Sequence, residues 1–146
     1  MGDRRRADGR SRTLRERAKE LNCLYRVEAV LAGDARPLPD IFRDLIEVIP
    51  SGWQHPRLCQ ARIVYGQTVC EPPGYKPTRW ADTVPIKEGN REVGLVEVSY
   101  VSEVPGSRKT VFLSKEHQLI RTIAGRIGQT ILHRNLQRLL REREAG

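Results

Sequence analysis

The residues that could carry chemistry gather in the stretch VIPSGWQHPRLCQARIVY, residues 48–65. It holds Trp53, His55 and Cys59 between a predicted helix and a predicted strand. Histidine and cysteine are common metal ligands, and structural metal sites repeat such ligands at short spacing. No Cys-x-x-Cys pair occurs, and the other two histidines fall on the predicted last helix. We therefore predict no metal site and an architectural corner, in which Pro50 and Trp53 have structural roles.

The three cysteines, Cys23, Cys59 and Cys70, are an odd number in a chain with no apolar signal-peptide stretch near its N-terminus. Disulfide frameworks belong to exported proteins, so we do not expect one here. Cys59 and Cys70 fall on neighbouring predicted strands, either as a redox pair or as small buried hydrophobic side chains, and we favour the second interpretation. No run of residues approaches the roughly 18 apolar positions of a membrane span. We expect a cytoplasmic protein without a membrane segment.

A loop with aromatic and basic residues, CEPPGYKPTRW, follows the second predicted strand. Loops carry much of the binding chemistry of proteins, and binding pockets combine apolar walls with a few polar groups. This loop either binds an anionic or aromatic small molecule against the sheet, or is a surface loop with a core tryptophan. The sequence identifies no ligand and no cofactor. The candidate ligand-binding residues are Arg62, Tyr65, Cys70, Tyr75, Arg79, Trp80 and Tyr100.

Positive charge is concentrated at the two ends of the chain. Residues 1–19 carry eight Lys or Arg against three Asp or Glu, and residues 115–146 carry seven against three. The body, 20–114, is close to neutral, with eleven basic and twelve acidic residues. Nucleic-acid-binding proteins more often carry basic charge on the body, beside aromatic or groove-reading elements. We therefore interpret the basic ends as solvated helix faces and do not expect nucleic acid as a partner.

Apolar residues at helical spacing predict a long helix near each end of the chain. The first spans 13–32 and the last spans 114–140, where Ser114 is the expected N-cap. A shorter helix with an apolar stripe from Ile41 to Ile49 follows the first. We expect residues 1–12 to form a basic, flexible N-terminus and residues 141–146 to fray. The single domain is then 13–140.

The last helix changes character along its length. Its isoleucines, from Ile120 to Ile131, should pack on the sheet, and the leucines that follow belong to an arginine-rich amphipathic helix of coiled-coil type. The first helix has a stripe at similar spacing that includes Tyr25. The predicted dimerisation residues are Leu14, Leu21, Ile127, Ile131, Leu132, Leu136 and Leu139.

Between these helices, the pattern predicts strands joined by tight turns. CQARIVY alternates apolar and polar residues, as a half-buried strand does. EVGLVEVSYV has apolar residues on both faces, which is typical of a central strand covered on both sides at least in part. Strands that follow one another without helices between them should form an antiparallel sheet. The predicted fold class is α+β.

The order of helix, helix, strands and long helix resembles the GAF-type sensory domains that accompany PAS and histidine kinase modules in bacterial signalling proteins. The resemblance covers residues 21–140 and rests on ELNCLYRVEAVL, LIEVIPSGWQHPRLCQARIVY, GNREVGLVEVSY and VFLSKEHQLIRTIAGRIGQTI. In domains similar to this one, these stretches are a lead-in helix, a Pro-x-x-Trp-Gln-x-Pro corner with an Ala-Arg-Ile strand, a Gly-x-Leu-x-Val-x-Tyr strand, and a Phe-Leu-x-x-Glu start of the last helix. The strand motif begins at Gly94, to which we assign a structural role.

The resemblance implies a GAF-like central antiparallel sheet flanked by helices, with the N- and C-terminal helices extending as a coiled-coil-type bundle. It also implies a ligand-sensing or signal-relaying role, as a parallel homodimer whose end helices connect to neighbouring domains. A signalling output domain such as a histidine kinase is then expected, either fused or as a separate partner. The free-methionine-sulfoxide reductases are an enzymatic branch of this superfamily, but their surrounding motifs are missing here. No catalytic Ser/His/Asp arrangement or glycine-rich phosphate loop is present either, so we do not expect an enzyme.

Three hypotheses of function follow from the sequence. The first is a sensory or regulatory module that binds a small molecule or relays a signal through its terminal helices. The second is a ligand-free dimerisation scaffold with an empty pocket, and the third is a nucleic-acid-associated protein that uses its arginine-rich ends. We prefer the first and place the second next.

Overall fold

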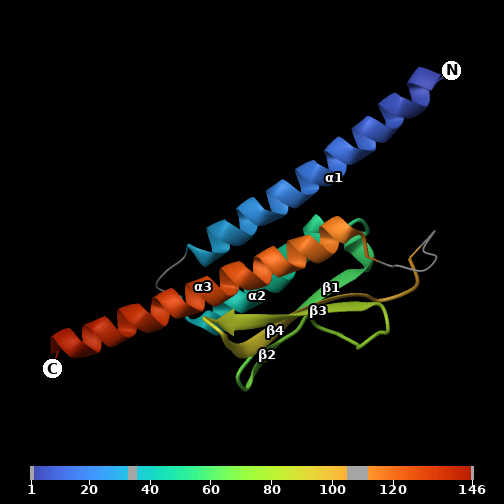
Figure 1. Ribbon diagram of the computed structural model, residues 1–146. Helices are drawn as coiled ribbons and strands as arrows, with labels where there is room; N and C mark the ends of the chain where they lie inside the picture. Colours follow the sequence, from blue (N-terminus) through green and yellow to red (C-terminus); the bar gives the residue numbers. More distant parts are fainter. Residues whose placement is uncertain (1, 33–35, 105–111, 146) are drawn as a thin grey trace.

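The computed structural model describes the backbone of residues 2–32, 36–104 and 112–145, and the side chains of residues 13–32, 36–104 and 112–144. The described part contains three long or medium helices, two short 3-10 helices and four strands (Figure 1). Their bounds are α1 Gly2–Leu31, α2 Leu38–Val48, η1 Ile49–Gly52, η2 Pro56–Leu58, β1 Cys59–Tyr65, β2 Thr68–Cys70, β3 Ala81–Glu88, β4 Arg91–Tyr100 and α3 Ser114–Ala145. The fold class is α+β, as predicted.

The four strands form one antiparallel sheet in the order β2-β1-β4-β3. Tight turns join β1 to β2 and β3 to β4, and Gly66 (φ 59°) and Gly89 (φ 65°) supply the left-handed backbone that such turns need. β4 is hydrogen-bonded to β1 on one side and to β3 on the other. The predictions of an antiparallel sheet and of a central strand at EVGLVEVSYV are confirmed.

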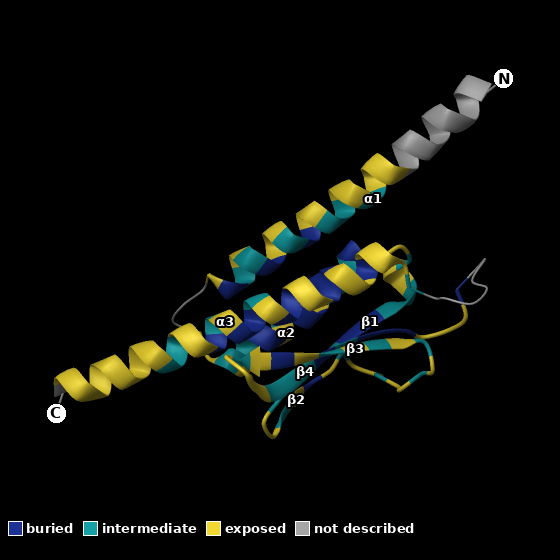
Figure 2. Cartoon of the chain, in the orientation of Figure 1, coloured by how far each residue is buried: buried dark blue, intermediate teal, exposed yellow. Residues whose placement is uncertain are grey.

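The core lies on one face of this sheet, where α2 and α3 pack directly on the strands and α1 packs on η1, α2 and α3. Figure 2 shows the buried residues gathered between these helices and the sheet. Because side chains alternate along a strand, every second residue of β1 and β4 points to this face. The fully buried strand residues on it are Ala61, Ile63, Ile86, Val96, Val98 and Tyr100. We call the opposite side the open face; Leu95 is half-buried there, whereas Val93, beside an irregularity in the pairing of β3 with β4, packs against the core.

The two terminal helices are longer than predicted. α1 begins at Gly2, so the backbone is helical over most of the range 1–12 that we expected to be flexible. α3 continues to Ala145, past the expected end at residue 140. Each residue added to an existing helix gains one backbone hydrogen bond, and neither extension contains a proline that would interrupt it.

Two of the residues predicted to form a dimer interface lie in the core instead. Ile127 and Ile131 of α3 are fully buried within the single chain, so their assignment to a dimer interface is wrong. The isoleucines from Ile120 to Ile131 pack α3 on the sheet, as predicted for the first half of this helix. The leucines named for dimerisation differ, since Leu14 is 67% exposed and Leu136 is 51% exposed. α1 contributes to the core through other residues, namely Cys23, Val27 and Leu31.

Gly128 allows α3 to lie very close to β3. A Cβ atom at this position would be 2.2 Å from the carbonyl oxygen of Lys87. Lys87 is at an irregularity in the pairing of β3 with β4. Gly125, one turn earlier on α3, has no described neighbour within 4 Å of the place where its Cβ would be. The two helical glycines therefore differ, because among the described residues a packing contact explains Gly128 but not Gly125.

We predict that Gly128→Ala lowers the free energy of unfolding by about 1–3 kcal/mol, because the added methyl group overpacks against the Lys87 carbonyl. Gly125→Ala is the matched control and, at a protein concentration where the chain is monomeric, should leave stability unchanged or raise it by up to about 1 kcal/mol through helix propensity. Urea unfolding at one low protein concentration measures both variants. Equal losses in the two would show that the approach of α3 to β3 is not the cause.

Candidate functional site at the start of α3

A buried carboxylate stands at the beginning of α3. Glu116 is only 4% exposed, and its Oε1 accepts a hydrogen bond of 2.9 Å from the backbone N–H of Leu113. Leu113 also accepts bonds from the backbone N–H groups of Glu116 and His117, so it occupies the cap position that we expected for Ser114. A glutamate three residues after a cap commonly bonds back to the cap N–H. Glu116 therefore satisfies a backbone donor that the helix cannot.

The second oxygen of Glu116 reaches the corner between η1 and η2. Its Oε2 accepts a bond of 2.7 Å from the backbone N–H of Gln54, which follows the fully buried Trp53. Two stretches 62 residues apart, the Pro-x-x-Trp-Gln-x-Pro corner and the Phe-Leu-x-x-Glu start of the last helix, are thus joined by one side chain.

The same corner also touches α1. A Cβ atom on Gly52 would lie 2.7 Å from Cδ2 of Leu119 in α3 and 2.9 Å from Cβ of Cys23 in α1. The thiol of Cys23 is 3.6 Å from the carbonyl oxygen of Ile49, to which it donates a hydrogen bond. Only glycine leaves room for both helices at this point. We call the contact of Cys23, Gly52, Gln54, Glu116 and Leu119 the corner joint.

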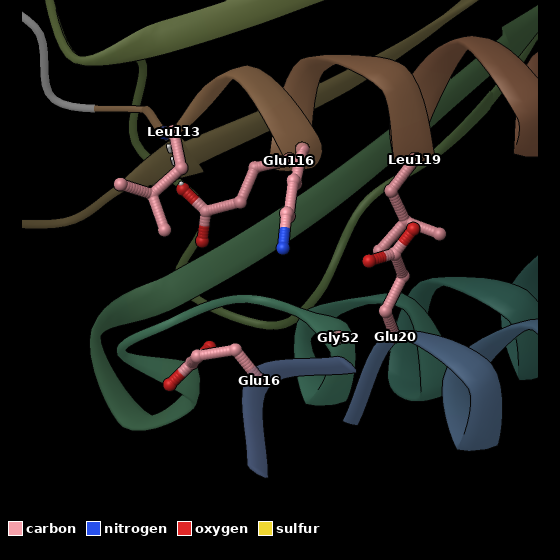
Figure 3. Close-up of a pocket in the computed structure, with 7 residues that line it drawn as sticks. Glu16, Glu20, Gly52, Leu113, Glu116 and Leu119 are labelled. Atoms are coloured by element: carbon pink, nitrogen blue, oxygen red, sulfur yellow. Dashed lines mark hydrogen bonds between the residues drawn. The ribbon is translucent and has the colours of Figure 1, made fainter. Parts of the chain in front are cut away.

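A small cleft opens beside the corner joint (Figure 3). Glu16 and Glu20 of α1 line one side of it. Glu116 and Leu119 of α3, together with Leu113 just before α3, line the other side, and Gly52 lies between the two helices. Lys115 also lines the cleft. The cleft thus has acidic side chains from two helices and one basic side chain.

Burial dominates the electrostatics of this site. It raises the pKa of Glu116, while the hydrogen bonds from Leu113 and Gln54 favour the charged form and lower that pKa. Burial and the nearby Glu116 raise the pKa of the Cys59 thiol and of the Tyr100 hydroxyl. A thiol that stays protonated is a poor nucleophile, so Cys59 is not suited to nucleophilic catalysis. The site is suited to a structural contact whose stability depends on pH.

Aromatic rings surround the buried polar atoms. Tyr100 stacks on Phe112 with ring centroids 5.3 Å apart and meets the His55 ring edge-on at 6.0 Å. Among the described residues, the Tyr100 hydroxyl and Trp53 Nε1 are buried without a hydrogen-bond partner. His55 belongs to a residue type that can bind metals, but here its ring packs against the ring of Tyr100.

The predicted ligand loop, 71–80, crosses the open face of the sheet. The Tyr75 hydroxyl donates a hydrogen bond to Glu97 of β4. Gln60 Nε2 donates to the carbonyl oxygen of Lys76 at 2.8 Å and to Ser99 Oγ at 2.9 Å. Burial and Glu97 raise the pKa of Tyr75 to about 12. The loop is fixed by polar bonds to the strands beneath it.

The seven candidate ligand-binding residues do not form one site. Arg62 lies 5.8 Å from the centre of the Tyr75 ring on the open face, where it also pairs with Glu71 at 3.3 Å. The guanidinium of Arg79 lies 4.8 Å from the centre of the Trp80 ring at the end of the loop.

The remaining three candidates are on the core side. The Tyr65 ring packs edge-on against Phe42, with centroids 5.9 Å apart, and the Cys70 thiol is 3.8 Å from the carbonyl oxygen of Pro39. Tyr100 is fully buried near the corner joint. The single-site prediction is therefore wrong, because strand alternation sends Arg62 and Tyr65 to opposite faces.

Cys59 and Cys70 are on neighbouring strands but cannot pair. Cys70 is opposite Ile63 in the register of β1 and β2, and Cys59 is four residues further along β1. At about 3.3 Å per residue the separation is roughly 13 Å, and a disulfide needs Cα atoms within about 7 Å. All three cysteines are free thiols, and the geometry excludes the redox pair.

The corner joint has no signal in the sequence, because no local pattern connects Trp53 and Gln54 with Glu116, which lies 62 residues after Gln54. Gly94 fits the structural role assigned to it in one respect, since a Cβ there would be 2.0 Å from the carbonyl oxygen of Val64. Pro50 is half-buried and lies in η1, the short helix that leads into the corner joint.

We predict that the unfolding free energy of the wild type, relative to Glu116→Gln, falls as pH rises between the ordinary pKa of a glutamate and the raised pKa of Glu116. In that interval the folded protein keeps a proton that the unfolded chain has released, so raising the pH favours unfolding. The slope is at most about 1.4 kcal/mol per pH unit. Urea unfolding over a pH series measures it, and Glu92→Gln, which removes an exposed carboxyl from β4, is the matched control. A flat difference between wild type and Glu116→Gln would contradict the prediction.

Within the described part of the chain, no three His, Cys, Asp or Glu side chains gather as a metal-binding group. A search of the described helices finds none with the length and apolar character of a membrane span. No family model, curated protein or solved structure matches this chain.

Proposed function

We propose that this chain is a GAF-type sensory or regulatory module that relays a signal between its two terminal helices, as a parallel homodimer. The observation that supports a relay is the corner joint, in which one tight turn contacts both α1 and α3. Gly52 leaves no space between Cys23 and Leu119. A displacement of α1 at this level therefore moves the corner, and the corner is hydrogen-bonded to the first turn of α3.

A second tie holds the two helices further along. Arg126 of α3 pairs with Glu28 of α1, with Nη2 2.9 Å from Oε2. The bond from Arg126 lowers the pKa of Glu28. Since residues 16–20 lie beside 113–119 and Glu28 lies beside Arg126, the helices run in the same direction. In Figure 1, α1 projects past the sheet at one end and α3 projects past it at the other.

A ligand for the sensor would bind on the open face, where Arg62 of β1 lies against the ring of Tyr75 in the loop 71–80. A guanidinium and a phenol ring suit an anionic or aromatic small molecule. The second candidate function, a ligand-free dimerisation scaffold, is favoured by the hydrogen bonds that Tyr75 and Gln60 already make. In either case the output domain is a fused or separate partner such as a histidine kinase, and the module is not an enzyme.

Hydrogen exchange tests the relay. In Glu116→Gln, the side chain keeps one carbonyl oxygen and cannot accept from both Leu113 and Gln54, so the corner joint weakens. We expect amide exchange to accelerate by roughly tenfold, the equivalent of one lost hydrogen bond, in 49–54 and in α1 near Cys23 together. Glu92→Gln is the matched control. Acceleration confined to the first turn of α3 would contradict coupling to α1.

Native mass spectrometry separates the sensor from the scaffold. A dimer of freshly purified protein that carries a discrete extra mass supports the sensor and gives the mass of its ligand. A dimer at the bare sequence mass favours the scaffold. Replacement of Arg62 by alanine should remove the extra mass, because the ligand loses its charged contact, whereas Arg79→Ala serves as a comparison at the far end of the loop.

The homodimer is tested by placing charges on the leucines of α3. Leu132 and Leu136 are 36% and 51% exposed, so Leu132→Glu with Leu136→Glu should dissociate the dimer without unfolding the sheet. Val69 and Val101, each 50% exposed and outside the helices, give the control pair of glutamate variants. Sedimentation velocity reports subunit number and circular dichroism reports folding. A monomeric wild type would contradict the dimer.

A further inference from the structure

The outward side of α1 is free of charge along its described length. Side chains that share this side at about 100° per residue are all exposed, and every charged residue between 13 and 31 lies on another side of the helix. The uncharged residues are Leu14, Ala18, Leu21, Asn22, Tyr25 and Ala29.

α3 has a matching outward side. Between residues 118 and 136 its exposed residues directly opposite the core are also uncharged. They are Gln118, Thr122, Gly125, Gln129, Leu132 and Leu136. We call these two sets of residues together the uncharged face. The exposed Arg121 of α3 lies at the edge of this face, where it lines a shallow hollow with Gln118 and Thr122.

The apolar part of the uncharged face passes from one helix to the other. Glu28 of α1 is level with Arg126 of α3, and both helices rise about 1.5 Å per residue. The end of α1 at Leu31 is therefore level with about Gln129, and the leucines of α3 begin at Leu132, about one turn beyond. The exposed leucines thus follow one line along the molecule, first on α1 and then on α3.

Gly125 lies where this line changes helix. It is exposed and has open space around its Cβ position, so no contact with the described residues requires a glycine. A glycine inside a helix costs about 0.5–1 kcal/mol relative to alanine. The distance between two packed helices depends on the side chains at their contact, so a glycine at this place permits the close approach of a helix from outside the chain.

We propose that a second copy of this chain covers the uncharged face in parallel orientation, with the two α3 helices crossing at Gly125. This rests on the proposed function, in which the module is a homodimer, and adds the surface and its register. Two copies that each carry a net charge of +8 repel unless like charges are kept out of their contact. A partner of opposite charge would instead be recognised by the basic sides of these helices. In a parallel pair related by a two-fold axis, each side chain near the axis lies opposite its own counterpart. Charged side chains would repel one another in this arrangement, whereas uncharged side chains do not.

Cysteine cross-linking of the full chain tests the register. Gly125→Cys and Leu132→Cys are on the uncharged face, and Gln137→Cys, exposed and on another side of α3, is the matched control. After mild oxidation we expect covalent dimers of the first two variants in non-reducing gels, at least tenfold more than for the control or the wild type. In an antiparallel pair crossing at Gly125, the two Leu132 positions would be about 21 Å apart, beyond the reach of a disulfide.

Each outcome decides the proposal. Cross-linking of both face variants supports it, and cross-linking of Gly125→Cys alone overturns the parallel orientation. If neither variant cross-links although the protein sediments as a dimer, the dimer uses another surface and the proposal is overturned. The proposed relay would not be affected, because hydrogen exchange tests it separately. A monomeric wild type overturns the proposal. Gly125→Gln, with a bulky side chain at the crossing, should weaken dimerisation at least tenfold in sedimentation equilibrium, and an unchanged affinity would overturn the crossing even if the cysteine variant failed to fold.

Discussion

The fold depends on one buried carboxylate that serves three segments of the chain. Glu116 satisfies the backbone N–H at the start of α3 and the backbone N–H of Gln54 in the corner. That corner in turn seats α1 through Gly52. A buried charge is costly unless it is fully hydrogen-bonded, and here the two partners are backbone donors that would otherwise be unsatisfied. This contact therefore links both long helices to the corner at the end of the molecule where α3 begins.

The strands and the last helix were accessible from the sequence because their signals are local. Alternation along CQARIVY places Ala61 and Ile63 on one side, and the isoleucines of α3 recur at helical spacing. The same alternation already contained the reason why Arg62 and Tyr65 could not share a site. The candidate ligand residues share a chemical type but not a face of the sheet, so their chemistry alone does not define a site.

The contacts between distant segments were not accessible in this way. Gln54 bonds to Glu116 across 62 residues, and Glu28 pairs with Arg126 across 98. No periodicity encodes such pairs, although both Gln54 and Glu116 belong to the stretches that carry the family resemblance. α1 posed a different difficulty, because it has apolar residues on two sides. Cys23 and Val27 are buried, so their side of α1 faces the core. The sequence pattern alone does not distinguish the two apolar sides of this helix.

The stagger of the two terminal helices has a consequence for how such a module can be built into a longer protein. α1 arrives and α3 departs in the same direction, at opposite ends of the sheet (Figure 1). Insertion of this unit between two helical segments therefore shifts the polypeptide sideways by one helix diameter, about 10 Å, without reversing its polarity. A series of such units would keep the same chain direction throughout, and each unit would displace the helix axis sideways by one further helix diameter.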